Sequence, residues 1–165
     1  MKNNYKIIDG YVYISLQKGK YQTKISLCDF ERANNFPGTW RAAYEPTVKG
    51  YYVRGHIRIN EKWTTMPLHR WLKKVTDFKI KVDHKNHDGL DNTDENLNVV
   101  TNAENCQNTK AKGYHLRKRS NKYETYIDVN GKRKWLGSFK HEEDAKIAYA
   151  TAKMKYHKYY ASIAV

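Results

Sequence analysis

Residues 82–89 read Val-Asp-His-Lys-Asn-His-Asp-Gly, and they are followed by Asn96-Leu97 and, nine residues after Asn96, by Asn105. Within this stretch, Asp83, His84, Asn96 and Asn105 provide a carboxylate, an imidazole and two amide side chains at defined spacings. The apolar residues Val82, Leu97 and Val99-Val100 alternate with the polar ones and frame them. The expected fold and the expected site both follow from this segment.

The segment resembles the HNH, or ββα-metal, endonuclease motif of phage and homing type, in the variant with asparagine in place of the last histidine. Leu68-His69-Arg70 resembles a segment that precedes the motif in phage and intron-encoded members, so the resemblance covers roughly residues 25–108. It implies that His84 is the general base and that Asp83 and Asn105 bind the metal. It also implies that Asn96 holds the histidine-bearing strand and ring in place by hydrogen bonds.

The residue types suit phosphodiester hydrolysis. That reaction needs an in-line water, a group that takes its proton, and positive charge on the phosphoryl and leaving oxygens. A histidine near its ordinary pKa suits the base role. A hard divalent cation prefers oxygen ligands, which an aspartate and an asparagine supply. We expect Mg²⁺, with Mn²⁺ as an alternative. We expect no structural zinc, because Cys28 and Cys106 are too few for a four-cysteine site.

Several neighbouring side chains have two interpretations. His69 lies on a mostly apolar segment and is either a packed residue or a supporting member of the catalytic group. Arg70 either contacts the DNA phosphate or extends along the surface. Asn92 and Asn98 are interpreted as helix caps or turn residues. His87 is expected to face solvent or phosphate rather than a metal.

The C-terminal part, residues 113–162, resembles the DNA-binding domain of plant ethylene-response (APETALA-type) transcription factors, a domain also found attached to phage HNH endonucleases. Trp135-Leu136-Gly137-Ser138-Phe139 and the Glu-Glu-Asp-Ala segment that begins at Glu142 are its most specific parts. The resemblance implies that a three-stranded sheet lies in the major groove with a helix packed behind it. Tyr126 and Asp128 depart from the plant pattern, so the plant target sequence is not expected.

Four side chains occupy the DNA-contacting positions of that domain. Alternation along a strand places Arg117 and Arg119 on one face of the first strand, and Arg133 and Trp135 on one face of the third. Arginine can read guanine or neutralise phosphate, and tryptophan can pack on sugar and base edges. A solvated basic sheet is the alternative.

The pattern of the chain predicts an α+β fold with four parts: a strand-rich N-terminal segment over 1–60, a ββα-metal nuclease core over 61–108, a linker over 109–112, and a three-stranded antiparallel sheet packed on one helix over 113–165. Expected strands span 5–8, 11–16, 51–59, 79–82, 114–119, 123–129 and 132–139, the last two joined by Asn130-Gly131. Expected helices span 66–75, 95–108 and 142–156, and the β-branched run Val99-Val100-Thr101 makes an interrupted second helix equally consistent. Trp40 and Tyr44 are expected in apolar packing, and no site is assigned to residues 1–60.

The net charge of +14 is concentrated toward the C-terminus, with 17 basic and 12 acidic side chains in residues 1–105 against 14 and 5 in residues 106–165. The electrostatic field of this positive charge attracts polyanions. The sequence has no signal-peptide core and no long apolar run, so we expect no membrane partner and a cytoplasmic protein of a bacterial host cell, encoded by a phage or a mobile element. Double-stranded DNA is the expected partner and the chain is expected to act as a monomer or homodimer. A DNA-binding regulator with a vestigial HNH fold is the main alternative, and an RNA-binding structural protein is another.

Overall fold

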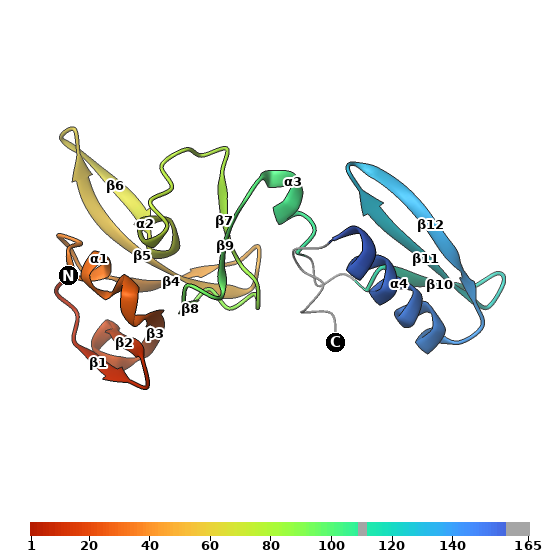
Figure 1. Cartoon of the computed structure of the whole chain (residues 1–165), viewed down its shortest axis with the longest axis horizontal. Helices are drawn as coiled ribbons and strands as arrows, with labels where there is room; N and C mark the ends of the chain where they lie inside the picture. The colour runs from red at the N-terminus through yellow and green to blue at the C-terminus, as the bar shows by residue number, and fades with distance from the viewer. Residues whose placement is uncertain (109–111, 158–165) are drawn as a thin grey trace. The chain divides into compact units, whose positions relative to one another are not determined.

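The computed structural model describes residues 1–108 and 112–157, and this part of the chain is a mixed α+β protein with several small sheets (Figure 1). The chain forms two compact units, residues 1–100 and 101–165. In the described residues no helix has the length and apolar character needed to cross a membrane.

The first unit contains three sheets. Its elements are β1 (Tyr5–Ile8), β2 (Tyr11–Leu16), β3 (Tyr21–Ser26), α1 (Phe30–Asn34), β4 (Arg41–Glu45), β5 (Gly50–Ile59), β6 (Lys62–Pro67), α2 (Leu68–Leu72), β7 (Lys81–His84), β8 (Asp91–Asn92) and β9 (Leu97–Val100), with short 3₁₀ turns η1 (Gln17–Gly19) and η2 (Leu27–Asp29). The sheets have the orders β1-β2-β3-β8, β4-β5-β6 and β7-β9. All strand pairs are antiparallel except β3 and β8.

One hydrophobic core holds these sheets together. It contains Val12, Ile14, Leu16, Ile25, Ala33, Phe36, Trp40, Ala42, Val53, Leu68, Leu72, Val82 and Leu97. Alternate residues of β2 are buried, as expected for a strand with one face on the core. Phe36 and Trp40 stack with ring centroids 3.8 Å apart and are almost fully buried. Trp40 is therefore in the apolar packing as expected, whereas Tyr44 is 53% exposed and that prediction is wrong.

The same core includes residues from before and after position 60, the boundary expected from the sequence. That boundary falls in the turn of the hairpin formed by β5 and β6, which pair from Ile59–Lys62 to Arg54–Pro67. Residues of the strand-rich segment consequently pack directly against the segment that carries the Asp-His pair.

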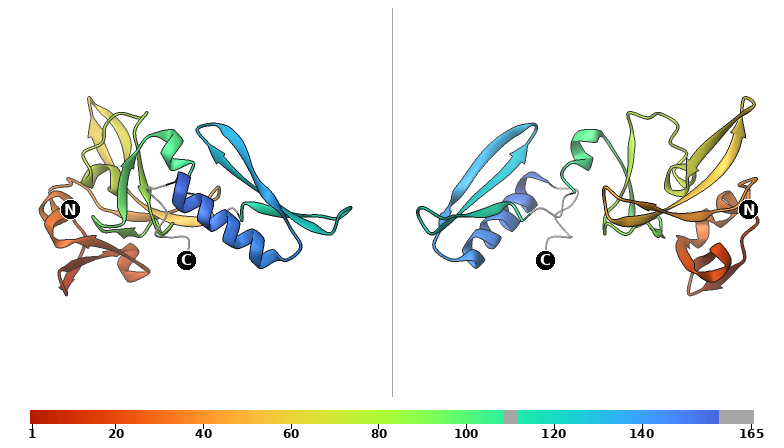
Figure 2. Two further views of the ribbon diagram at one scale, coloured as in Figure 1. Left: turned by 45° about the vertical axis from the view of Figure 1, so that its right-hand side comes forward. Right: turned by 180° about the vertical axis from the view of Figure 1, so that it is seen from behind.

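The second unit has the architecture expected for residues 113–165. Its elements are α3 (Asn102–Asn105), β10 (Tyr114–Arg117), β11 (Lys122–Val129), β12 (Lys132–Phe139) and α4 (Glu142–Tyr156). The three strands form an antiparallel sheet, and α4 lies along one face of it (Figure 2). Asn130 and Gly131 both have positive φ, as the expected two-residue hairpin turn requires. On α4, Ala145 and Ala152 are buried.

Some boundaries differ from the sequence-based expectation for local reasons. The helix expected over 66–75 is shorter, because Met66 belongs to β6 and Lys74 adopts a positive φ that a helix cannot contain. The strand expected over 79–82 begins two residues later. The helix expected over 95–108 is replaced by β9 and then α3, as the β-branched run favours. Thr101 begins α3 with a capping box that involves Glu104.

Candidate active site

The Asp-His pair ends β7, which pairs with β9 in the order His84 opposite Leu97 and Asp83 opposite Asn98. Because strand side chains alternate, His84 points toward the core side and Asp83 toward the other side. His84 is 3% exposed, whereas Asp83 is half-buried. A loop of residues 85–96, which includes β8, then connects the two strands.

The Asn92 side chain contacts the His84 ring. His84 Nε2 lies 3.1 Å from Asn92 Oδ1, and both side chains are buried. The Asn92 amide nitrogen in turn donates to Thr23 Oγ1 (3.0 Å) and to the Gly89 carbonyl oxygen (3.2 Å). Thr23 lies on β3, so the loop is connected to a strand that is 69 positions earlier in the sequence.

Asn96 holds the backbone of the same loop. Its amide nitrogen donates to the Asp91 carbonyl oxygen (2.7 Å), and its Oδ1 accepts from the Asn86 backbone nitrogen (3.0 Å). Its own carbonyl oxygen accepts from the Lys85 backbone nitrogen (2.9 Å). Asn96 thus ties together the backbone of the loop that follows His84. The side chain of Asn92 hydrogen-bonds to the histidine ring.

His69 and Tyr52 form one wall of the site. The ring centroid of His84 lies 5.1 Å from that of His69 and 5.5 Å from that of Tyr52, with the rings edge to face. His69 comes from α2 and Tyr52 from β5. The sequence-predicted pair His69 and His84 is therefore brought together. Gly89 completes the wall, because a Cβ there would meet the Tyr51 carbonyl oxygen and the Tyr52 ring.

Burial keeps both histidines neutral. It lowers the pKa of His69 to about 3, with a smaller contribution from His84 and from nearby arginines. It also lowers the pKa of His84, although the hydrogen bond between its Nε2 and Asn92 Oδ1 and the charge of Asp83 oppose this. The Nδ1 atom of His69 is inaccessible to solvent and has no hydrogen-bond partner among the described residues.

The two expected metal ligands lie in different units. Asp83 has Asn98 as its cross-strand neighbour, which places an amide and a carboxylate on the same face of the β7–β9 pair. Asn105 ends α3 in the second unit, and the structure does not place it relative to Asp83. In the described residues no three His, Cys, Asp or Glu side chains gather as a metal-binding group. The oxygen donors that remain, a carboxylate and amide carbonyls, fit a hard divalent cation that keeps some of its own water.

Arg70 has well-defined partners within the protein. Its guanidinium donates to the carbonyl oxygens of Ile80 (2.8 Å) and Asp77 (2.7 Å). These bonds connect α2 to the turn before β7, which begins at Lys81. Arg70 therefore positions the strand that carries His84.

The exposed face of the C-terminal sheet carries three of the four residues expected to contact DNA. Arg117 pairs with Glu124 (2.6 Å), Arg133 makes two bonds to Asp128 (2.9 and 3.0 Å), and Trp135 is 53% exposed. These arginines hold the pKa of Glu124 and Asp128 below the usual carboxylate range.

The expected strand position of Arg119 is wrong. The first strand of this sheet ends at Arg117, and Arg119 lies in the turn before β11. Strand alternation therefore does not place it on the face of Arg117, although its side chain is exposed.

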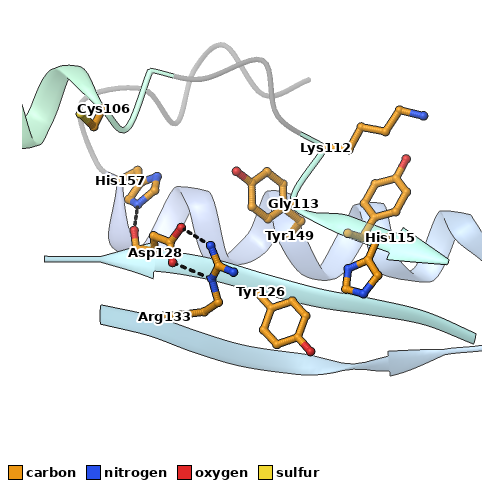
Figure 3. Close-up of a pocket in the computed structure, with 10 residues that line it drawn as sticks. Cys106, Lys112, Gly113, His115, Tyr126, Asp128, Arg133, Tyr149 and His157 are labelled. Atoms are coloured by element: carbon orange, nitrogen blue, oxygen red, sulfur yellow. Dashed lines mark hydrogen bonds and ion pairs between the residues drawn. The ribbon is translucent and has the colours of Figure 1, made fainter. Parts of the chain in front are cut away.

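An aromatic row crosses the same face, one ring from each strand. His115 stacks on Tyr126 with an interplanar angle of 6°, and Tyr126 meets Trp135 edge to face with centroids 4.8 Å apart. A cavity of about 480 Å³ adjoins this row (Figure 3). Its lining includes Lys112, Tyr149 and His157, and Figure 3 shows the Arg133–Asp128 pair among the residues that line it.

Comparisons of the chain with protein families, with curated proteins and with solved structures found no match. The functional assignment consequently depends on the residues and their geometry.

Sequence reasoning missed three residues of this site: Thr23, Tyr52 and Asn92. Asn92 had been interpreted as a turn residue, and the other two lie in the segment to which no site was assigned. No local signal identifies Thr23 or Tyr52, since only the folding of β3 and β5 against the loop brings them to His84. The burial of Asn92 is likewise a tertiary property.

Proposed function

We propose that this protein is a metal-dependent DNA endonuclease of the HNH type, in which His84 is the general base. The observation that carries the proposal is the buried His84 beside Asp83 at the end of β7, with its loop held by Asn96. β7 and β9 pair, and α3 follows them in the sequence, which is the order of a ββα motif.

The neutral state of His84 suits its role. A base must be unprotonated at the working pH, and burial lowers the pKa of this ring. The ring takes a proton from water as the water attacks the phosphorus. The bond between phosphorus and the 3′ oxygen breaks, the 3′ oxygen takes a proton from solvent to become the 3′-hydroxyl, and the 5′-phosphate remains on the other strand end. His69 and Tyr52 exclude bulk water from one side of the ring and fix its orientation.

Asp83 and Asn105 are the residues that would hold the cation, with Mg²⁺ favoured and Mn²⁺ as an alternative. When bound, a divalent cation supplies positive charge for the phosphoryl and leaving oxygens. Asn98 supplies a further amide directly opposite Asp83 on β9.

A basic sheet face leads to the site in the first unit. The face of β4-β5-β6 opposite the buried Ala42 and Val53 carries Arg41, Tyr52, Arg54, His56, Arg58 and Trp63. Trp63 is 73% exposed, and Glu45, the acidic residue on this face, is paired with Arg54. Since Tyr52 at the inner end contacts His84, DNA bound along this face would reach the base. The C-terminal sheet would supply a second anchor on duplex DNA through Arg117, Arg133 and Trp135.

Nicking of supercoiled DNA tests the proposal. Wild type, His84→Ala and the control His141→Ala, an exposed histidine of the second unit, are compared in Mg²⁺, Mn²⁺ and EDTA. We expect metal-dependent relaxation by wild type and the control, and none by His84→Ala, while all three bind DNA equally. One base per chain predicts a nick by a monomer and a double-strand cut by a dimer or by two nicks. A folded, DNA-binding wild type that cleaves none of a broad set of phage and plasmid DNAs would instead support a regulator.

A further inference from the structure

The buried amide of Asn92 connects three parts of the first unit. Its side chain is fully buried, and its hydrogen bonds reach His84 on β7, Thr23 on β3 and Gly89 in the intervening loop. A buried amide with both ends satisfied is held in one orientation.

The hydrogen bonds around Asn92 define which end of the amide faces His84. The Gly89 carbonyl oxygen can only accept, so the atom facing it must be the amide nitrogen. Thr23 leads to the same result, because its hydroxyl already donates to the Leu90 carbonyl oxygen (2.6 Å) and must therefore accept from Asn92. Oδ1 consequently faces His84.

An amide oxygen has no proton to give, so His84 Nε2 must be the donor across the 3.1 Å contact. In a neutral imidazole only one nitrogen is protonated. The lone pair of the His84 ring therefore lies on Nδ1. His69 and Tyr52 contact the ring edge to face and fix its plane without selecting a nitrogen.

We propose that Asn92, held by Thr23, is the positioning residue that selects the Nε2–H tautomer of His84, so that Nδ1 is the atom that accepts the proton of water. The tautomer stands on the hydrogen bonds alone, whereas its catalytic consequence rests on the proposed nuclease function. Asn92 acts through His84 and does not itself touch the reacting atoms.

Nitrogen-15 NMR of the imidazole groups in the full-length protein tests the tautomer directly. We expect wild type at neutral pH to show a pyrrole-type Nε2 with a slowly exchanging proton and a pyridine-type Nδ1 for His84. In Asn92→Ala the Nε2 proton signal should be lost to exchange with water. A wild-type ring protonated on Nδ1, or an Nε2–H signal unchanged in Asn92→Ala, would overturn the proposal.

A matched series at Thr23 covers the case in which Asn92→Ala does not fold. Thr23→Val removes the acceptor for the Asn92 amide and should speed exchange of the His84 Nε2 proton, whereas Thr23→Ser keeps the hydroxyl and should restore slow exchange. The control is Thr93→Val, because the buried Thr93 hydroxyl in the same loop donates to Asp91 and takes no part in the hydrogen bonds that join Thr23, Asn92 and His84. Equal exchange in Thr23→Val and Thr93→Val contradicts the role of Thr23.

Cleavage kinetics then measure the consequence. Loss of the residue that positions a catalytic histidine should lower kcat by about 10- to 100-fold. We therefore expect Asn92→Ala to lower kcat and to leave KM for DNA unchanged. Thr23→Ser should have a higher kcat than Thr23→Val. An unchanged kcat in Asn92→Ala would overturn the catalytic part. If the tautomer is as expected and wild type cleaves no DNA, the proposed function fails and the tautomer assignment stands.

Discussion

His69 and His84 share a site in which neither ring can be charged at low cost. Unfolded His69 would take a proton below a pKa of 6.5, whereas the folded protein excludes that proton until about pH 3. Between these values the unfolded state binds more protons, so the free energy of unfolding falls as the pH decreases. This follows from burial of an imidazole with an unpartnered nitrogen.

The variant His69→Leu tests this dependence by denaturant unfolding between pH 4 and pH 7. We expect the slope of unfolding free energy against pH to decrease by up to about 1.4 kcal/mol per pH unit, which corresponds to the uptake of about one proton on unfolding. Exposed His56 serves as the control, and His56→Leu should keep the wild-type slope. Identical slopes in all three proteins would show that His69 is protonated freely in the folded state.

Asn96 stabilises the loop after His84 because its side chain forms two hydrogen bonds to backbone atoms of that loop. Because the residue is 6% exposed, Asn96→Ala leaves the Asn86 nitrogen and the Asp91 carbonyl oxygen without these partners. We expect a loss of about 1–3 kcal/mol in unfolding free energy. The control Asn98→Ala, a more exposed neighbour, should stay within about 0.5 kcal/mol of wild type. Equal losses in the two variants would contradict the role assigned to Asn96.

The hairpin of β5 and β6 presents different side chains on its two faces. Arg58 and Trp63 are cross-strand neighbours on the exposed face, whereas Ile59 and Lys62 lie on the opposite face. We expect Arg58→Ala and Trp63→Ala to weaken binding to duplex DNA by about tenfold each, in line with a loss of about 1–3 kcal/mol per good contact. Lys62→Ala removes the same charge from the same hairpin and should have less effect. If a binding titration shows equal weakening by Arg58→Ala and Lys62→Ala, the hairpin attracts DNA through its overall positive charge and not through contacts on one face.

At the scale of the whole molecule, the proposed nuclease function assigns DNA binding and DNA cleavage to different groups. Under that proposal, phosphate contacts make binding salt-dependent without a metal, whereas cleavage needs the cation that Asp83 and Asn105 would hold. We therefore expect EDTA to abolish nicking and leave the affinity for duplex DNA unchanged. In Arg117→Ala/Arg133→Ala, affinity and its salt dependence should both fall, while Mg²⁺ still supports residual nicking at high protein concentration. Loss of DNA binding in EDTA would show that the metal also holds the substrate.

Local patterns in the sequence were sufficient for many elements. The expected strands 5–8, 11–16 and 132–139 and the helix 142–156 match β1, β2, β12 and α4. Period-two and period-3.6 apolar spacing and the Asn130-Gly131 turn are properties of adjacent residues, so they can be read without a fold. The proposed role of His84 came from the resemblance of its segment to the HNH motif, and the structure buries that ring and places His69 against it.

Only the tertiary structure decided what surrounds the histidine. Thr23 and Tyr52 come from strands that are distant in the sequence from His84, and Asn92 resembles any loop asparagine until its burial is known. The bounds of β7 follow from its pairing with β9, which runs from Lys81 opposite Val100 to His84 opposite Leu97. Such contacts depend on which surfaces the hydrophobic core brings together. The spacing of side chains along the sequence does not determine which distant segments meet.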